Sequence, residues 1–156
     1  MATVYLALGS NLGDRRATLD RALEALRANP AIRVTVVSTF VETAPVGGPA
    51  GQGPYLNGAA RIETDLAPAD LLAELKRIEH ALGRRPGPRW GPRPIDLDII
   101  LYGDLEMDTP DLVIPHPRFR DRRFVLAPLA EIAPEALDPV TQRTVAQLLA
   151  DLVAEG

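Results

Sequence analysis

Two aspartates stand two residues apart inside an otherwise apolar run, PIDLDIILYG. A run this rich in Ile and Leu is typical of a buried β-strand. Successive side chains of a strand alternate between its faces, so Asp96 and Asp98 are predicted to share one face. The other face would carry the aliphatic side chains that enter a core: Leu97, Ile99 and Leu101. Two like charges on one face are costly to bury alone, so water, arginines or a metal ion must cover them.

The aspartate pair has a metal-binding interpretation and a plainer one. Mg²⁺ takes oxygen ligands and is commonly held by one or two carboxylates together with substrate phosphates. Alternatively, the pair is ordinary solvated surface, because D-x-D alone is a weak signal. The flanks favour the metal site, since arginine suits bidentate phosphate binding and all but one of the 17 basic residues are arginine. Eight of them bracket the aspartates in sequence: Arg84, Arg85, Arg89, Arg93, Arg118, Arg120, Arg122 and Arg123.

Bulk composition bounds the class of protein. The chain has 156 residues, which predicts one domain over residues 1–156 with a sizeable core. The net charge of −4 argues against general nucleic-acid binding, and the absence of cysteine excludes disulfides and thiolate metal sites. The N-terminal MATVYLALGSN has no basic leader and too short an apolar run for a membrane span. We therefore expect a cytoplasmic monomer that binds neither membrane nor nucleic acid.

Patterns of apolar and β-branched residues predict three strands before the aspartate strand. Their expected ranges are 3–8, 32–41 and 56–63. Two segments rich in Gly, Pro or Arg predict long loops beside the site: 43–54 and 84–94.

Helix signals alternate with these strands. Asp14 is a candidate N-cap for a first helix, and Pro68 suits the first turn of a second helix that Gly83 ends. Thr144 and Gln147 have the spacing of a capping box for a last helix. The order β-α-β-β-α-β predicts an α+β fold, a ferredoxin-like αβ sandwich whose mainly antiparallel sheet is covered by helices and carries long active-site loops.

Three further positions have a functional and a structural interpretation. Tyr55 and Asn57 would share a strand face, where an aromatic plate beside an amide suits a flat heterocycle, but both could equally serve core and turn. His116 stands between two prolines that fix its backbone, so it could donate to a phosphate or only bond its own loop. Trp90 is either a lid over a ligand or an anchor for its loop.

Six segments carry a resemblance to a known family: LGSNLGDR, TAPVGGP, YLN, RWGPRPIDLDIILYG, IPHPR and RFVLAPLAEIAP. In this order they resemble the 6-hydroxymethyl-7,8-dihydropterin pyrophosphokinases of folate biosynthesis. The resemblance runs along the whole chain and implies transfer of pyrophosphate from ATP to the hydroxymethyl group of the pterin, with release of AMP. It also implies that Asp96 and Asp98 bind two Mg²⁺ ions and that ATP and the pterin are the small-molecule partners.

The same resemblance assigns roles to other residues. The implied catalytic residues are Arg84, Arg93, Asp96 and Asp98. The implied pterin-binding residues are Thr43, Val46, Tyr55, Asn57 and Phe124, with the rings of Tyr55 and Phe124 on either side of the pterin. The implied ATP-binding residues are Arg84, Arg89, Trp90, Arg93, His116 and Arg122.

Two other functions stay open at the level of the residues alone. An RNA-binding ferredoxin-like module would use the arginines, but it predicts aromatic residues on the sheet face, and the chain has only three Phe and three Tyr. A different metal-dependent phosphotransferase or nucleotide hydrolase would use Asp96 and Asp98, but it leaves the proposed heterocycle pocket without a role.

Overall fold

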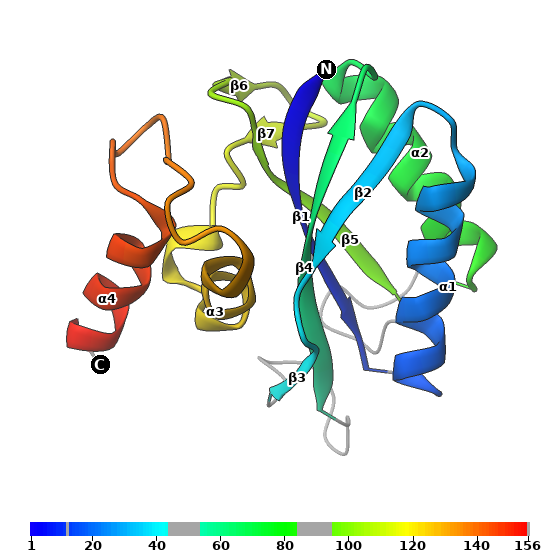
Figure 1. Ribbon diagram of the computed structural model, residues 1–156, viewed down its shortest axis with the longest axis horizontal. Helices are drawn as coiled ribbons and strands as arrows, with labels where there is room; N and C mark the ends of the chain where they lie inside the picture. The colour runs from blue at the N-terminus through cyan, green and yellow to red at the C-terminus, as the bar shows by residue number, and fades with distance from the viewer. Residues whose placement is uncertain (12, 44–53, 84–94, 156) are drawn as a thin grey trace.

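The computed structural model describes residues 1–11, 13–43, 54–83 and 95–155. Its centre is a five-stranded sheet with the order β2-β4-β1-β5, in which β3 also pairs with β4 (Figure 1). Every pairing in this sheet is antiparallel. The strands span Ala2–Ser10 (β1), Ile32–Val37 (β2), Val41–Thr43 (β3), Tyr55–Thr64 (β4) and Asp96–Tyr102 (β5).

Two helices connect these strands in the predicted order. Helix α1 (Arg15–Ala28) follows β1, and helix α2 (Pro68–Ala81) runs between β4 and β5. Both cover the same face of the sheet (Figure 1). Apart from the short additional strand β3, the order is β-α-β-β-α-β, and together with the antiparallel sheet it confirms the predicted ferredoxin-like α+β fold.

The predicted start and stop signals act where the sequence places them. The Asp14 carboxylate accepts a hydrogen bond from the backbone N–H of Ala17 at 3.1 Å, which satisfies one of the free donors at the start of α1. Helix α2 begins at Pro68, and Gly83 follows its end with φ of 103°, a conformation that favours glycine. No helix in the described part of the chain combines the length and apolar character that crossing a membrane requires.

The opposite face of the sheet is covered by the C-terminal third of the chain. Helix α3 (Arg123–Ile132) packs on it, and α4 (Val145–Glu155) packs against α3 (Figure 1). The predicted capping box is present, because Gln147 Oε1 accepts from the Thr144 N–H at 2.8 Å and Thr144 Oγ1 accepts from the Gln147 N–H at 3.2 Å. Shorter elements complete this part: β6 (Met107–Asp108), β7 (Val113–Ile114) and the 3-10 turn η1 (Phe119–Asp121).

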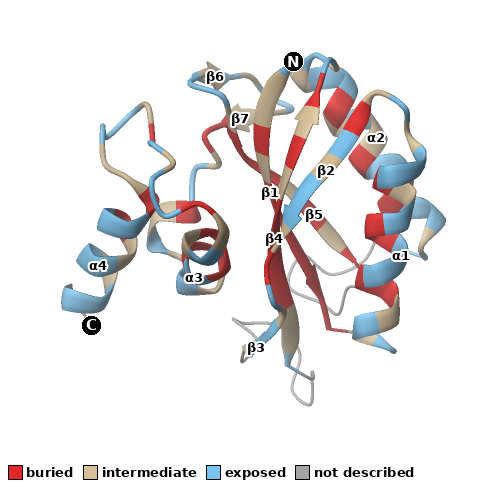
Figure 2. Ribbon diagram, in the orientation of Figure 1, coloured by how far each residue is buried: buried red, intermediate tan, exposed pale blue. Residues whose placement is uncertain are grey.

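The sheet therefore separates two apolar cores. Leu6, Leu19 and Leu75 are fully buried between the sheet and the α1/α2 layer, whereas Phe119 and Leu126 are fully buried on the α3 side. Figure 2 shows the buried positions along the sheet and on the helix sides that face it.

Strand β5 departs from strict alternation. Its ladder with β1 shifts register, so that Leu6 pairs with Ile99 but Tyr5 pairs with Leu101, leaving Ile100 as the extra residue of a β-bulge. Leu97 and Ile99 enter the α1/α2 core as predicted. The prediction that Leu101 shares their face is wrong, because one extra residue turns every later side chain over, and Leu101 enters the α3 core.

The strand predicted over 32–41 is interrupted at Ser38. The Ser38 N–H donates to the Ala59 carbonyl at 2.9 Å, and Ser38 Oγ accepts from the Ala59 N–H at 2.8 Å, so a side chain replaces the backbone acceptor. The Phe40 ring then lies against Gly58, where an added Cβ would come within 2.4 Å of it. The chain resumes as β3, whose last residue, Thr43, was expected in a loop.

Candidate active site

The paired aspartates lie on the α3 side of the sheet, level with the start of β4. Gly9 pairs with Asp96 on one side and with Asn57 on the other, and Ala7 pairs with Asp98. Antiparallel partners point to the same face, and Ala7 belongs to the α3 core. Asp96 and Asn57 are thus two strand spacings apart, roughly 10 Å. The position between them is glycine, so the Asn57 and Tyr55 side chains can lie over its backbone.

The Asn57 side chain is buried and held in one orientation. Its Nδ2 donates to Thr43 Oγ1 at 2.5 Å, and only 6% of the residue is exposed. A Cβ on Gly9 would lie 2.8 Å from Asn57 Oδ1 and 3.5 Å from the Tyr55 ring, which shows that this glycine admits both side chains. Thr43 pairs with Tyr55 in the ladder between β3 and β4. The structure therefore brings together three of the predicted pterin residues: Thr43, Tyr55 and Asn57.

Phe124 reaches the same side of the sheet from the first turn of α3. It is half-buried and packs against the α3 core, and the Arg122 guanidinium lies 5.7 Å from the centre of its ring. At this distance the cation and the aromatic face attract each other. The packing of α3 on the sheet thus puts Phe124 and Arg122 on the side that carries the aspartates.

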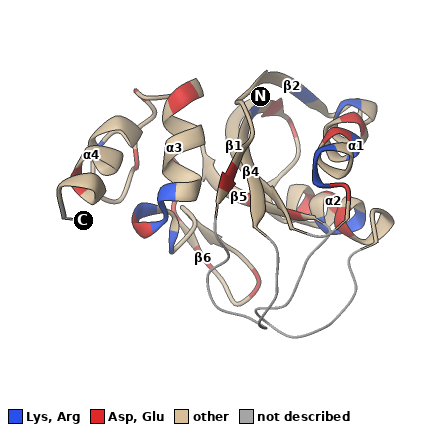
Figure 3. Ribbon diagram, turned by 90° about the horizontal axis from the view of Figure 1, so that it is seen from below, with Lys and Arg blue, Asp and Glu red and all other residues tan. Residues whose placement is uncertain are grey.

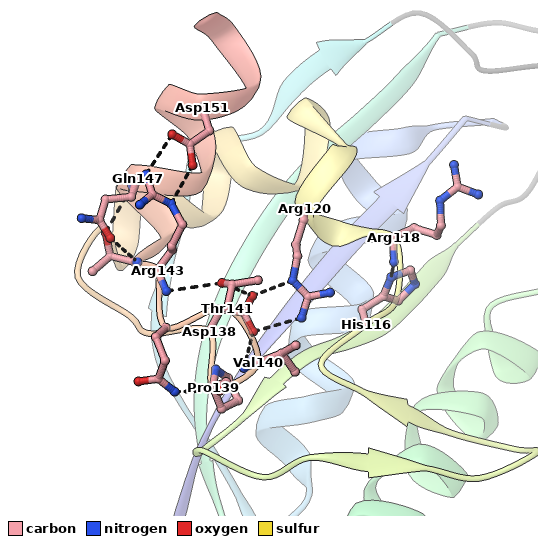
Figure 4. A network of polar contacts seen from close by, with 12 residues as sticks. His116, Arg118, Arg120, Asp138, Pro139, Val140, Thr141, Arg143, Gln147 and Asp151 are labelled. Atoms are coloured by element: carbon pink, nitrogen blue, oxygen red, sulfur yellow. Dashed lines mark hydrogen bonds and ion pairs between the residues drawn. The ribbon is translucent and has the colours of Figure 1, made fainter. Parts of the chain in front are cut away.

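His116 is attached to the aspartate strand and is held neutral. Its backbone N–H donates to the Ile100 carbonyl at 3.0 Å, and its Nδ1 accepts from the Arg118 N–H at 3.1 Å (Figure 4). Burial, together with the nearby charges of Arg122 and Arg118 and against the opposing charge of Asp121, lowers the pKa of His116 to about 4. At neutral pH the single ring proton therefore sits on Nε2, which makes that nitrogen a hydrogen-bond donor.

Arg120, one of the eight arginines that bracket the aspartates in sequence, pairs with Asp138 instead. Its Nε and a terminal nitrogen donate to Asp138 at 2.5 and 3.0 Å, and Figure 4 shows the side chain directed at Asp138 rather than toward His116. Asp138 is fully buried and also accepts from Thr141 Oγ1 at 2.7 Å and the Val140 N–H at 3.0 Å. Basic residues gather at the start of α3 and on the turn before it (Figure 3). Arg120, however, anchors the 134–144 segment through its hydrogen bonds to Asp138.

Arg15 is a contributor that sequence reasoning missed. From the first position of α1 it donates to the Pro54 carbonyl at 2.9 Å and pairs with Glu42. Glu42 precedes Thr43 and Pro54 precedes Tyr55, so one side chain ties together the ends of β3 and β4 that carry two of the site residues. Arg15 stands in the LGSNLGDR motif, yet its partners are distant in sequence and only the fold brings them near.

The remaining predicted site residues lie outside the described residues. They are Val46 in the 43–54 segment, and Arg84, Arg89, Trp90 and Arg93 in the 84–94 segment. Their roles remain predictions.

The carboxylates of Asp96 and Asp98 fit a hard cation. Both residues are partly exposed and present oxygen donors on one face of a strand. The described residues contain no cluster of three or more His, Cys, Asp or Glu side chains suited to a metal. A pair of carboxylates is nevertheless typical of Mg²⁺, which keeps waters and shares its remaining positions with substrate phosphates.

Comparison with known proteins supplies the family. Residues 5–134 match the model of the 7,8-dihydro-6-hydroxymethylpterin-pyrophosphokinase (HPPK) family. The chain is 49% identical over 128 residues to 2-amino-4-hydroxy-6-hydroxymethyldihydropteridine pyrophosphokinase of Bacillus subtilis, covering 82% of this chain and 76% of that protein. It is 45% identical over 156 residues to the protein of the same name from Methylorubrum extorquens, covering 100% and 97% of the two.

Solved structures agree at the level of the fold. The Plasmodium falciparum HPPK-DHPS structure with pteroate aligns with 99% of this chain at a TM-score of 0.77 and 15% identity. The chain spans less than half of that bifunctional protein, 43% of its length. The sequence relatives thus define the chain as an enzyme of the pyrophosphokinase class. Within that class it belongs to the 7,8-dihydro-6-hydroxymethylpterin-pyrophosphokinase family, as its motifs predicted.

Proposed function

We propose that this protein transfers pyrophosphate from ATP to the hydroxymethyl group of 6-hydroxymethyl-7,8-dihydropterin in folate biosynthesis. In this reaction the hydroxyl oxygen attacks the β-phosphorus of ATP, the bond from that phosphorus to the oxygen bridging it to the α-phosphate breaks, and AMP leaves. The hydroxyl proton is lost as the new bond forms. One observation carries the proposal: Gly9 separates Asp96 from Asn57 on a single sheet face, which supports a phosphate-side and a heterocycle-side site within one short span.

On the phosphate side, Asp96 and Asp98 would hold Mg²⁺, and we propose two ions. Bound there, the metal supplies charge neutralisation of the triphosphate and alignment of the attacking and leaving oxygens. His116 would donate from Nε2 to the nucleotide, and it does so without adding positive charge because it is neutral. Arg122, next to Phe124, would meet the ATP from the same side.

On the heterocycle side, Tyr55 and Phe124 would stack on the two faces of the pterin. Asn57 would read the pterin edge, because its amide can both donate and accept and its orientation is already set by Thr43. A ring system held between two aromatic planes and fixed by one buried amide has little freedom, which brings its hydroxymethyl group to the phosphate side in a defined position.

A product assay tests the proposal directly. The purified protein is incubated with ATP and Mg²⁺, with and without 6-hydroxymethyl-7,8-dihydropterin, and the nucleotides are separated. AMP is expected only when the pterin is present. Formation of ADP, or AMP release that ignores the pterin, would instead favour a different phosphotransferase or a nucleotide hydrolase.

Substitutions in the two halves separate their roles. Asp98→Ala is expected to lower turnover by about 100-fold or more while the protein stays folded, because a partly exposed metal ligand contributes little to the core. The matched control is Asp108→Ala on β6, an exposed aspartate outside the site. Tyr55→Ala should weaken pterin binding and leave ATP binding nearly unchanged; equal losses of both would contradict the assignment of Tyr55 to the heterocycle.

A further inference from the structure

The aspartate pair stands on an edge strand. Within the described residues β5 forms a ladder only with β1, so its other edge has no ladder partner; farther along the strand the Ile100 carbonyl accepts from the His116 N–H. N–H groups of consecutive residues in a strand point to alternate sides. The N–H of Leu97, the residue between Asp96 and Asp98, points to the open side. An edge strand presents backbone N–H groups that have no ladder partner, and Leu97 is buried, so its N–H needs another acceptor.

Helix α2 supplies that partner in a buried carboxylate. Glu79 Oε2 accepts the Leu97 N–H at 2.8 Å. Glu79 is only 5% exposed and shares the inward side of α2 with Leu75 and Ile78, where an apolar side chain would be expected. A carboxylate is costly to bury and is retained where it makes strong, charge-assisted hydrogen bonds.

The atoms involved connect Glu79 directly to the aspartates. The Leu97 N–H belongs to the peptide unit whose carbonyl is that of Asp96, and Leu97 is bonded through its own carbonyl to Asp98. Rotation of this peptide unit would turn both carboxylates relative to each other. The ladder with β1 holds the strand from one side, through the Gly9–Asp96 and Ala7–Asp98 pairs, and Glu79 holds it from the other.

We propose that Glu79 is a positioning residue for the aspartate pair: its hydrogen bond to the Leu97 amide holds the β5 backbone so that Asp96 and Asp98 present their carboxylates together to the Mg²⁺ site. The catalytic consequence rests on the proposed function, whereas the backbone restraint does not. Partners one step removed from a metal ligand commonly change metal affinity or activity by about 10–100-fold when removed.

Three substitutions separate the hydrogen bond from charge and packing. Glu79→Gln removes the charge and keeps an acceptor of the same reach. Glu79→Met keeps the length of the side chain and removes the acceptor. Glu79→Asp keeps the charge and withdraws the acceptor by one methylene. Glu74→Met is the matched control, because Glu74 lies on the same helix, is also largely buried, and bonds Asn29 at 2.5 Å rather than β5.

The first readout is the hydrogen-exchange rate of the Leu97 amide, measured by NMR in the absence of substrates. Exchange should be about 10-fold faster or more in Glu79→Met and Glu79→Asp, and nearly unchanged in Glu79→Gln and Glu74→Met. The second readout is the Mg²⁺ dependence of pyrophosphate transfer. Half-saturation should need about 10-fold more Mg²⁺ in the Met and Asp variants, with the KM for the pterin within about 2-fold of wild type.

Each of the two measurements can contradict the inference independently of the other. Wild-type exchange at Leu97 in both Glu79→Met and Glu79→Asp would overturn the inference whatever the activity. An inactive Glu79→Gln beside a normal Glu79→Asp would also overturn it, since charge rather than the hydrogen bond would then be required. If Glu79→Met does not fold, the Asp and Gln variants alone decide. Absence of pterin-dependent AMP in the wild-type protein would refute the proposed function and leave the exchange result standing.

Discussion

Arg120→Ala should strongly destabilise the folded protein, although the Arg120 side chain is itself partly exposed. The substitution removes two donors from Asp138, which is 0% exposed and keeps only the bonds from Thr141 and the Val140 N–H. Breaking a buried pair in this way costs about 3–5 kcal/mol, because it leaves an uncompensated buried charge. For a domain of this length each kcal/mol lowers the Tm by about 2–4 °C, which gives a loss of roughly 6–20 °C.

The pH dependence gives this prediction a second, independent test. Burial alone would raise the pKa of Asp138, but the hydrogen bonds from Arg120, Thr141 and Val140 outweigh it and hold the pKa below its usual value. In the wild type this carboxylate therefore contributes stability that is present above its unfolded pKa and is lost as the pH falls through the lower folded pKa. In Arg120→Ala the hydrogen bonds from Arg120 are absent, so burial raises the pKa of Asp138. The loss of stability relative to the wild type should therefore be largest at neutral pH and shrink toward pH 4.

Urea unfolding followed by circular dichroism at pH 7 and at pH 4 measures both effects. Arg143→Ala is the control, because Arg143 also makes two hydrogen bonds to an aspartate, Asp151, but both side chains are exposed, at 44% and 47%. That pair should contribute about 1 kcal/mol or less. Equal losses for Arg120→Ala and Arg143→Ala, or a loss in Arg120→Ala that grows as the pH falls, would refute the reasoning from burial.

Three further outcomes are expected. Gly9→Ala should weaken pterin binding by about 10-fold in calorimetry and leave ATP binding intact, because its Cβ would lie 2.8 Å from Asn57 Oδ1 and force that amide to move; an unchanged pterin affinity would exclude Asn57 from the contact. Gly58→Ala should cost about 1–3 kcal/mol in urea unfolding, since its Cβ would lie 2.4 Å from the Phe40 ring, and a neutral effect would contradict that packing. The His116 ring should titrate near pH 4 in NMR, with the signals assigned through His80→Gln; a midpoint near 6.5 would contradict its burial.

Local rules were sufficient wherever neighbours in sequence decide the structure. Period-two alternation predicted that Asp96 and Asp98 share a face, and the cap signals at Asp14 and Pro68 predicted where two helices begin. These predictions hold because the interactions involved span two to four residues. The prediction for Leu101 failed because the bulge at Ile100 depends on how β5 meets β1, which alternation along one strand does not encode.

The candidate site shows the same division. Thr43, Tyr55, Asn57 and Phe124 were indicated by motif, but the hydrogen bond that orients Asn57 and the close approach of Asn57 to Gly9 depend on strand register. Long-range partners were the part that sequence reasoning could not supply, as the distant contacts made by Arg15 and the coupling of Arg120 to Asp138 illustrate.

By itself the sequence determined the family, the α+β class and the pairing of Asp96 with Asp98 on one face, because motifs and backbone periodicity are properties of contiguous residues. Only the tertiary structure decided which charges are free to act. It buried Asp138 and joined it to Arg120, kept His116 neutral, and set Glu79 against the backbone between the two aspartates. The physical reason is that burial and charge pairing arise between elements far apart in the chain, and they decide whether an ionisable side chain is held in the structure or left to meet a ligand.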